Sequence, residues 1–126
     1  MTPDELRNRL AAFAHAVARF CRPLLTRVDA RNTLLQLESA SSSAAANYRA
    51  AGRARSRREF IAKLGLAREE ADEAVFWLDY LVESGIIAAE DVSSLRREAR
   101  ELLLILSKSY STARTRLETA TRKRRG

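Results

Sequence analysis

Glycine, proline, cysteine and histidine are all scarce in this sequence of 126 residues. It has four Gly, two Pro, one Cys and one His. Because Gly and Pro mark tight turns, their scarcity favours long helices with short connections. The single Cys21 cannot form a disulfide within one chain, and we expect it to be a small buried hydrophobic residue. This cysteine usage indicates a reducing compartment, so we expect a cytoplasmic protein.

The same shortages leave little material for catalysis or metal binding. His15 is the only histidine, so the Glu-x-x-His pairs of di-iron bundles and any Cys/His cluster are missing. The sequence has no glycine-rich phosphate loop and no defensible Ser-His-Asp arrangement. We therefore predict a protein without catalytic residues, metal or cofactor.

Long apolar runs are missing as well. The longest strongly apolar run is Leu102 to Leu106, whereas a helix needs roughly 20 apolar residues to cross a bilayer. The first residues, Met-Thr-Pro-Asp-Glu, lack the charged and then apolar pattern of a signal peptide. We expect no membrane partner.

The sequence does contain four stretches with helical periodicity. Thr2-Pro-Asp-Glu5 is a capping box, and apolar residues follow it at spacings of three and four until Pro23. Asp29 is suited to cap a second helix over about residues 30–54. This second helix is rich in Ser and Ala, and such small side chains favour a close contact between helices.

A second capping box, Ser56-x-x-Glu59, opens a third helix over about residues 57–83. Gly85 is suited to the left-handed position that follows the end of a helix. A fourth helix starts near residue 89 and fades near residue 118. The apolar seam of the third helix is predicted to consist of Phe60, Leu64, Ala67, Ala71, Ala74, Leu78 and Leu81.

Four helices with one apolar seam each predict an all-α, up-down-up-down antiparallel four-helix bundle. We expect a single domain over residues 1–120 and a frayed basic tail over residues 121–126. The third and fourth helices carry more apolar residues than one seam needs, which indicates either a broad core face or contacts between subunits. We favour a homo-oligomer. The additional apolar residues are Phe76, Trp77, Tyr80, Leu103, Leu104 and Ile105.

Basic charge is concentrated in two blocks of the sequence. The formal net charge is +7, which favours an anionic partner. No acidic residue occurs from residue 39 through 58, whereas residues 59–83 of the third helix hold seven acidic residues against Lys63 and Arg68. The first block is Arg49, Arg53, Arg55, Arg57 and Arg58, and the second is Arg122, Lys123, Arg124 and Arg125.

This segregation of charge has three interpretations. The arginine run can be a solvated face, as most charge runs are. It can also steer the basic surface of one subunit onto the acidic surface of another. Finally, the planar guanidinium groups can hold the phosphates of RNA or DNA. We favour nucleic acid, and expect backbone-dominated binding because the sequence has no motif for reading a DNA groove.

Residues of the second and third helices also match a family pattern. The pattern resembles that of the four-helix-bundle proteins encoded in intervening sequences of bacterial 23S rRNA genes, over about residues 34–114. One departure is Ala50, where the family usually has Glu. The matching blocks are Ala46-Asn47-x-x-x-Ala51-x-x-Ala54-x-Ser56, Glu59-Phe60-x-x-Lys63-Leu64, Ala67-x-x-Glu70-Ala71-x-Glu73, Trp77-Leu78, Glu98-x-x-Glu101-Leu102 and Ser111-Thr112-Ala113.

The resemblance implies a bundle that assembles as a ring-like homopentamer and has no known catalysis. The same bundle is used by accessory variability proteins of diversity-generating retroelements, which are basic, bind nucleic acid and work with a reverse transcriptase. We therefore expect RNA or DNA as a partner, with a reverse transcriptase as a further candidate. The alternative is a structural or protein-binding oligomer.

The polar and aromatic residues that match the family are candidates for a structural role. Glu70 and Glu73 resemble half of a carboxylate metal site, but a network that fixes helix or subunit register is the favoured interpretation. The residues are Asn47, Ser56, Phe60, Lys63, Glu70, Glu73 and Trp77.

A helical ribonuclease is a distant alternative. Arg9 and His15 have the spacing of the Arg-His pair of some helical ribonucleases. One such spacing is expected by chance in an arginine-rich chain, and His15 is interpreted as a surface residue.

Overall fold

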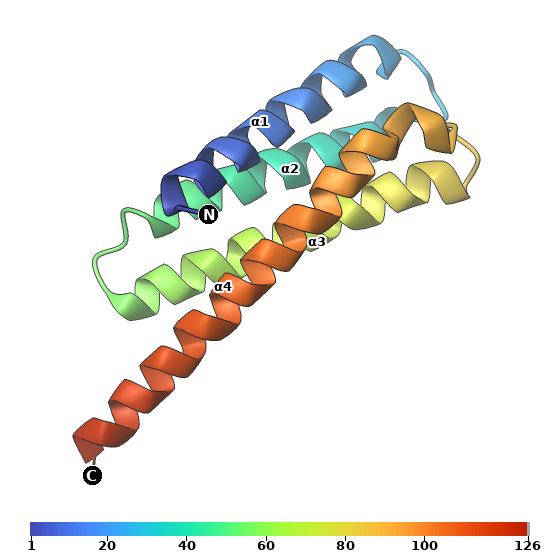
Figure 1. The fold of residues 1–126 in the computed structure, drawn as a ribbon. Helices are drawn as coiled ribbons and strands as arrows, with labels where there is room; N and C mark the ends of the chain where they lie inside the picture. The colour runs from blue at the N-terminus through green and yellow to red at the C-terminus, as the bar shows by residue number, and fades with distance from the viewer. Residues whose placement is uncertain (126) are drawn as a thin grey trace.

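The computed structural model describes residues 1–125, which form four α-helices and two short 3-10 helices (Figure 1). Successive α-helices run antiparallel, as the sequence predicts for an all-α four-helix bundle. Gly126, the last residue of the predicted tail, lies outside the described residues. The elements are α1 (Pro3–Cys21), η1 (Arg22–Leu24), α2 (Arg31–Ala51), α3 (Arg57–Glu83), η2 (Ala89–Val92) and α4 (Ser93–Arg125).

The predicted start and stop signals of α1 and α3 are confirmed. The hydroxyl oxygens of Thr2 and Ser56 accept hydrogen bonds of 3.1 Å from the backbone N–H groups of Glu5 and Glu59. Each bond satisfies a backbone donor that the helix leaves without a partner in its first turn. Gly85 follows the end of α3 with a φ of 76°, in the left-handed region that favours glycine.

The predicted cap of α2 is wrong. Ala30 occupies the N-cap position, without a capping hydrogen bond from its side chain. The carboxylate of Asp29 instead binds the guanidinium of Arg27, at 2.7 Å from Nη2. A bidentate ion pair two residues away thus takes up the side chain that the sequence suggests as a cap. The helix ends at Ala51 rather than near residue 54.

The predicted end of α4 is also wrong, because the helix continues from residue 118 through Arg125. Arg114 and Glu118 form an ion pair one turn apart, at 3.5 Å, and basic residues fill the last turn. Both features favour helix, since cations near the carboxyl end interact well with the helix dipole. The second basic block is therefore helical, and Figure 1 shows α4 projecting beyond the other three helices.

The core is made of leucine and alanine side chains from all four helices. The most extensive helix contact is between α2 and α3, where small buried residues recur on both helices. The predicted seam of α3 is wrong at one residue. Phe60 is only half-buried, and its neighbour Ile61 is buried instead. The other six predicted seam residues are buried. The small buried residues are Ala40, Ser41 and Ala44 on α2 and Ala67, Ala71 and Ala74 on α3.

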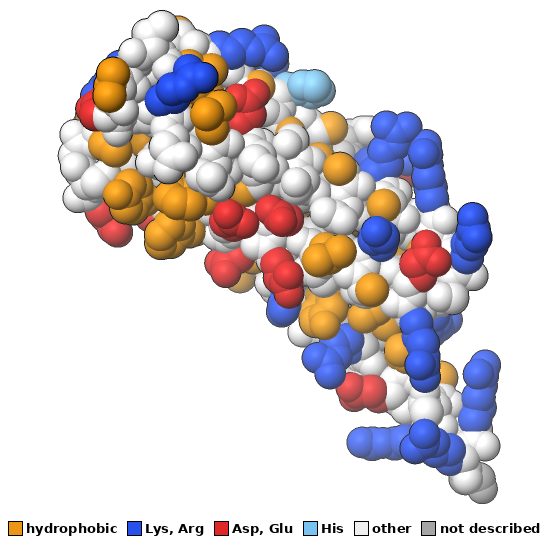
Figure 2. Space-filling model, turned by 180° about the vertical axis from the view of Figure 1, so that it is seen from behind, with side chains coloured by type: hydrophobic (Ala, Val, Ile, Leu, Met, Phe, Trp, Pro, Cys, Tyr) orange, Lys and Arg blue, Asp and Glu red, His pale blue; other side chains and the backbone are white. Residues whose placement is uncertain are grey.

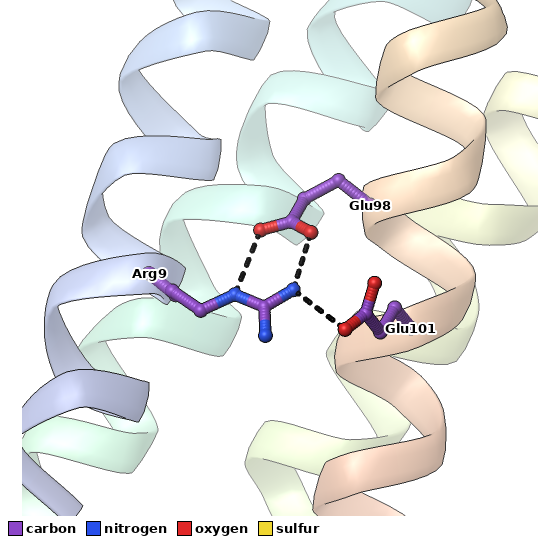
Figure 3. Close-up of polar contacts among 3 residues, drawn as sticks. All are labelled: Arg9, Glu98 and Glu101. Carbon is purple, nitrogen blue, oxygen red and sulfur yellow. Dashed lines mark hydrogen bonds and ion pairs between the residues drawn. The ribbon is translucent and has the colours of Figure 1, made fainter. Parts of the chain in front are cut away.

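Ion pairs fasten α4 to both of its neighbours. Arg9 on α1 forms a bidentate pair with Glu98 and contacts Glu101 at 3.2 Å (Figure 3). The hydrogen bond to Glu98 raises the pKa of Arg9 above its usual value. On the other side, Asp79 of α3 accepts from Arg96 and Arg100, each at 2.9 Å. Elsewhere α4 lies against α3, while α1 and α4 meet over a short stretch only.

Cys21 lies in the core, as the sequence predicts. Cys21 is buried, and this burial raises the pKa of its thiol to about 12. It is therefore a small core residue rather than a reactive thiol.

Among the described residues, no helix is both long and apolar enough to cross a membrane.

Candidate nucleic-acid interface

The fold brings the two basic blocks, which lie far apart in the sequence, to one end of the bundle. The start of α3 and the last turns of α4 enclose a hollow of about 330 Å³. Its α3 side carries Ser56, Arg57 and Arg58, and its α4 side carries Thr121 and Arg124. Guanidinium groups from both blocks thus flank the same space, because α3 and α4 run antiparallel.

A second hollow adjoins the first, one turn further along both helices. It measures about 350 Å³, and Arg57 and Phe60 of α3 line it together with Ala113 and Arg116 of α4. Arg57 belongs to both hollows, so the two are continuous along the seam between α3 and α4. Arg116 is not among the residues that the sequence indicates.

The third hollow lies on the other side of Phe60, between α1 and α2, and has a volume of about 800 Å³. Arg49 and Arg53 line it from α2, and Arg7 lines it from α1. Arg7 lies 3.4 Å from Asp4, and both side chains are largely exposed. Burial raises the pKa of the Tyr48 hydroxyl in the same wall. Phe60 therefore stands between two hollows that both carry arginines.

All nine predicted nucleic-acid-binding residues are exposed. Within residues 1–125, none of them forms an ion pair with an acidic side chain. Figure 2 shows Lys and Arg side chains gathered towards the end from which α4 projects, and acidic side chains along the middle of the molecule. The segregation predicted from the sequence thus holds in space.

Not every predicted residue lines a hollow. Arg55 is exposed in the turn between α2 and α3, and Arg58 and Arg124 line the outermost hollow only. Arg122, Lys123 and Arg125 are exposed on the last turn of α4. Arg55 and these three residues of α4 add to the positive field of this end without lining its hollows.

The family-matching polar residues make local contacts within their own helices. The side-chain amide of Asn47 donates to the carbonyl of Ser43 at 3.0 Å, and the indole N–H of Trp77 donates to Glu73 at 3.2 Å. Burial, and after it the charge of Glu73, raises the pKa of Glu70. Lys63 is half-buried. In the part of the chain that the structure describes, no group of acidic, His and Cys side chains is arranged to hold a metal ion.

Comparison with protein families identifies the family of this chain. The model of the 23S rRNA-intervening sequence protein family matches residues 8–108, which covers most of the chain. The chain belongs to this family. The match starts within α1, earlier than the resemblance around Asn47 and Trp77 indicates, and so includes all four helices.

A solved structure supports the same assignment. This intervening-sequence protein is similar to a protein of unknown function from the S23 ribosomal protein family of Bacteroides thetaiotaomicron. The TM-score is 0.81 at 26% sequence identity, over 88% of this chain and 99% of that chain. A comparison with curated proteins gave no match.

Proposed function

We propose that this intervening-sequence protein binds RNA or DNA through the basic end of its bundle, as a non-enzymatic homo-oligomer. The observation that supports this most is the convergence of the two basic blocks around hollows flanked by Arg57, Arg116 and Arg124. Exposed cations that are free of acidic partners are available to replace the counterions around phosphates. These cations are spread over α2, α3 and α4, as expected for binding to a nucleic-acid backbone with its regularly spaced phosphates.

Binding of this kind is expected to weaken steeply with salt. If about four phosphates are neutralised, affinity falls on the order of 100-fold between about 50 and 200 mM salt, because bound counterions are released. A gel-shift titration with labelled RNA and DNA of mixed sequence at the two salt concentrations measures this. As a control, unlabelled competitors of one defined sequence should displace the labelled nucleic acid no better than competitors of random sequence. Retention that does not respond to salt, or no retention at all, would contradict the proposal.

Self-association is supported by an exposed aromatic patch on α3, formed by Phe76, Trp77 and Tyr80. The ring centroids of Phe76 and Trp77 lie 4.9 Å apart, and those of Trp77 and Tyr80 lie 5.7 Å apart. Phe76 is 55% exposed and Tyr80 43% exposed. Contiguous exposed apolar surface is typical of a contact between proteins. The same patch supports the second candidate function, a structural oligomer that does not require nucleic acid.

Changing Phe76 and Tyr80 together to Glu is expected to dissociate the oligomer, because charge would be buried at the contact. Light scattering should give about five times the 14.2 kDa of one chain for the parent, as a pentamer requires, and one chain mass for the variant. Val28→Glu is the control, since Val28 is 97% exposed outside the patch and should leave the mass unchanged. A parent protein with the mass of one chain would refute self-association.

A helical ribonuclease has less structural support than nucleic-acid binding without catalysis. It requires Arg9, but Glu98 and Glu101 already engage the guanidinium of this residue. The Arg-His spacing in α1 therefore supports no catalytic pair.

We retain a reverse transcriptase as a proposed partner, on the basis of the family resemblance. The genes on either side of this one provide the check, since a neighbouring reverse-transcriptase gene is expected.

A further inference from the structure

We infer that the basic end selects single-stranded nucleic acid, by stacking an unpaired base on Phe60. This inference rests on the proposed function and specifies its ligand. Phe60 is the aromatic residue that lines both the hollow between α3 and α4 and the hollow between α1 and α2. It is half-buried, with one part packed against the core and the rest facing these spaces.

The surroundings of Phe60 suit a nucleotide better than a purely apolar ligand. Arg57 and Arg116 share the smaller hollow with it, and Arg49 and Arg53 share the larger one. Hollows of about 350 and 800 Å³ lie in the size range of clefts that bind small organic groups. A base on the ring therefore has guanidinium groups on both sides for the phosphates that precede and follow it.

Single strands offer what this arrangement needs. Every base has an aromatic face, and stacking on a protein side chain contributes about 1–3 kcal/mol per base with little sequence preference. In a duplex the neighbouring base pairs cover those faces, so Phe60 gains nothing from an intact double helix. Phosphate contacts alone would not favour the single strand, because a duplex has the higher charge density and releases more counterions for each phosphate that is neutralised.

Tyr110, the nearby aromatic residue of α4, is already occupied. The guanidinium of Arg68 lies 4.4 Å from the centroid of its ring, and that of Arg114 lies 5.8 Å away. The edge of the ring packs closely against Gly65, where an added Cβ would lie 3.0 Å from Tyr110 Cε2. Its face is thus covered within the chain. Tyr48 lines the larger hollow only, so among the described residues Phe60 is the ring that lines both arginine-lined hollows.

The test compares Phe60→Leu with Phe60→Tyr in the full chain. Leu keeps an apolar group against the core but removes the flat ring, whereas Tyr keeps the ring. Affinity for oligo(U) or oligo(dT) should fall about 5-fold or more in Phe60→Leu and stay near the parent value in Phe60→Tyr, since one stacked base is lost. Affinity for a duplex of equal length should not change. The salt dependence should be the same in all three proteins, because no cation is removed.

Phe20→Leu is the matched control, because Phe20 is half-buried like Phe60 but lies near the end of α1, at the opposite end of the bundle, so its loss should leave both affinities unchanged. Circular dichroism confirms that each variant is folded. Equal affinity of Phe60→Leu and the parent for single strands would overturn the inference while leaving the proposed function intact. If the parent binds neither single strands nor duplex, the proposed function itself fails.

Discussion

Replacement of Arg53, Arg57 and Arg58 by Glu is expected to lower the affinity for RNA and DNA on the order of 100-fold at low salt. Three exposed cations around the hollows become three anions, so attraction to phosphate changes to repulsion. The slope of log affinity against log salt should also become shallower, because fewer counterions are released. Gel-shift titrations at several salt concentrations measure both quantities.

The control is a variant with the same change in net charge at other exposed positions. Arg19, Arg22 and Arg97 are exposed and lie where α1 ends and α4 begins, at the opposite end of the bundle. Their replacement by Glu should reduce affinity only slightly, through the long-range field. If both triple variants lose affinity equally, net charge rather than the basic end determines binding, and the proposed interface is wrong.

Ala44→Leu is expected to destabilise the fold by about 1–3 kcal/mol or more, because a core of this density has no room for three additional carbons. Ala44 is 1% exposed, on the face of α2 that contributes small residues to the core. The larger side chain would force α2 away from the elements packed against it. Urea unfolding followed by circular dichroism should show a lower midpoint with a similar slope.

Ala46→Leu is the matched control, since Ala46 is exposed on the same helix two residues away. Leu and Ala have similar helix propensities, so this variant should have nearly the stability of the parent. An Ala44→Leu protein as stable as the parent would mean that the close approach of α2 is not required for the fold.

Local signals in the sequence predict most of the fold. Thr2 and Ser56 start helices because a side-chain oxygen and a backbone donor three residues later meet without any tertiary contact. Asp29 is wrongly predicted as a cap because its carboxylate pairs with Arg27, and the sequence does not show which of the two partners the carboxylate binds. The length of α4 is missed because polar residues extend a helix through pairs such as Arg114 with Glu118, without an apolar seam.

The candidate interface is only half evident from the sequence. The arginine run from residue 49 to 58 is conspicuous, but Arg7 and Arg116 come from other helices and belong to neither basic block of the sequence. An antiparallel register between the third and fourth helices would have placed Arg116 opposite Arg57, as the structure does. Periodicity predicts that Phe60 is in the apolar seam. The pattern shows which side of the helix faces the core, but it does not show how far around the helix the buried surface extends.

The projecting part of α4 has a consequence for motion. Its fully buried residues are Ala99, Leu102 and Leu106, all in the first half of the helix, and Tyr110 and Ala113 beyond them are only partly covered. Local opening is easiest where few apolar contacts must be broken, so backbone amides should exchange with solvent fastest in the last turns. The segment that carries the second basic block is thus the least restrained by packing. A polyanion that bridges it to α3 would slow that exchange, so ligand binding and local order in this arm are thermodynamically linked.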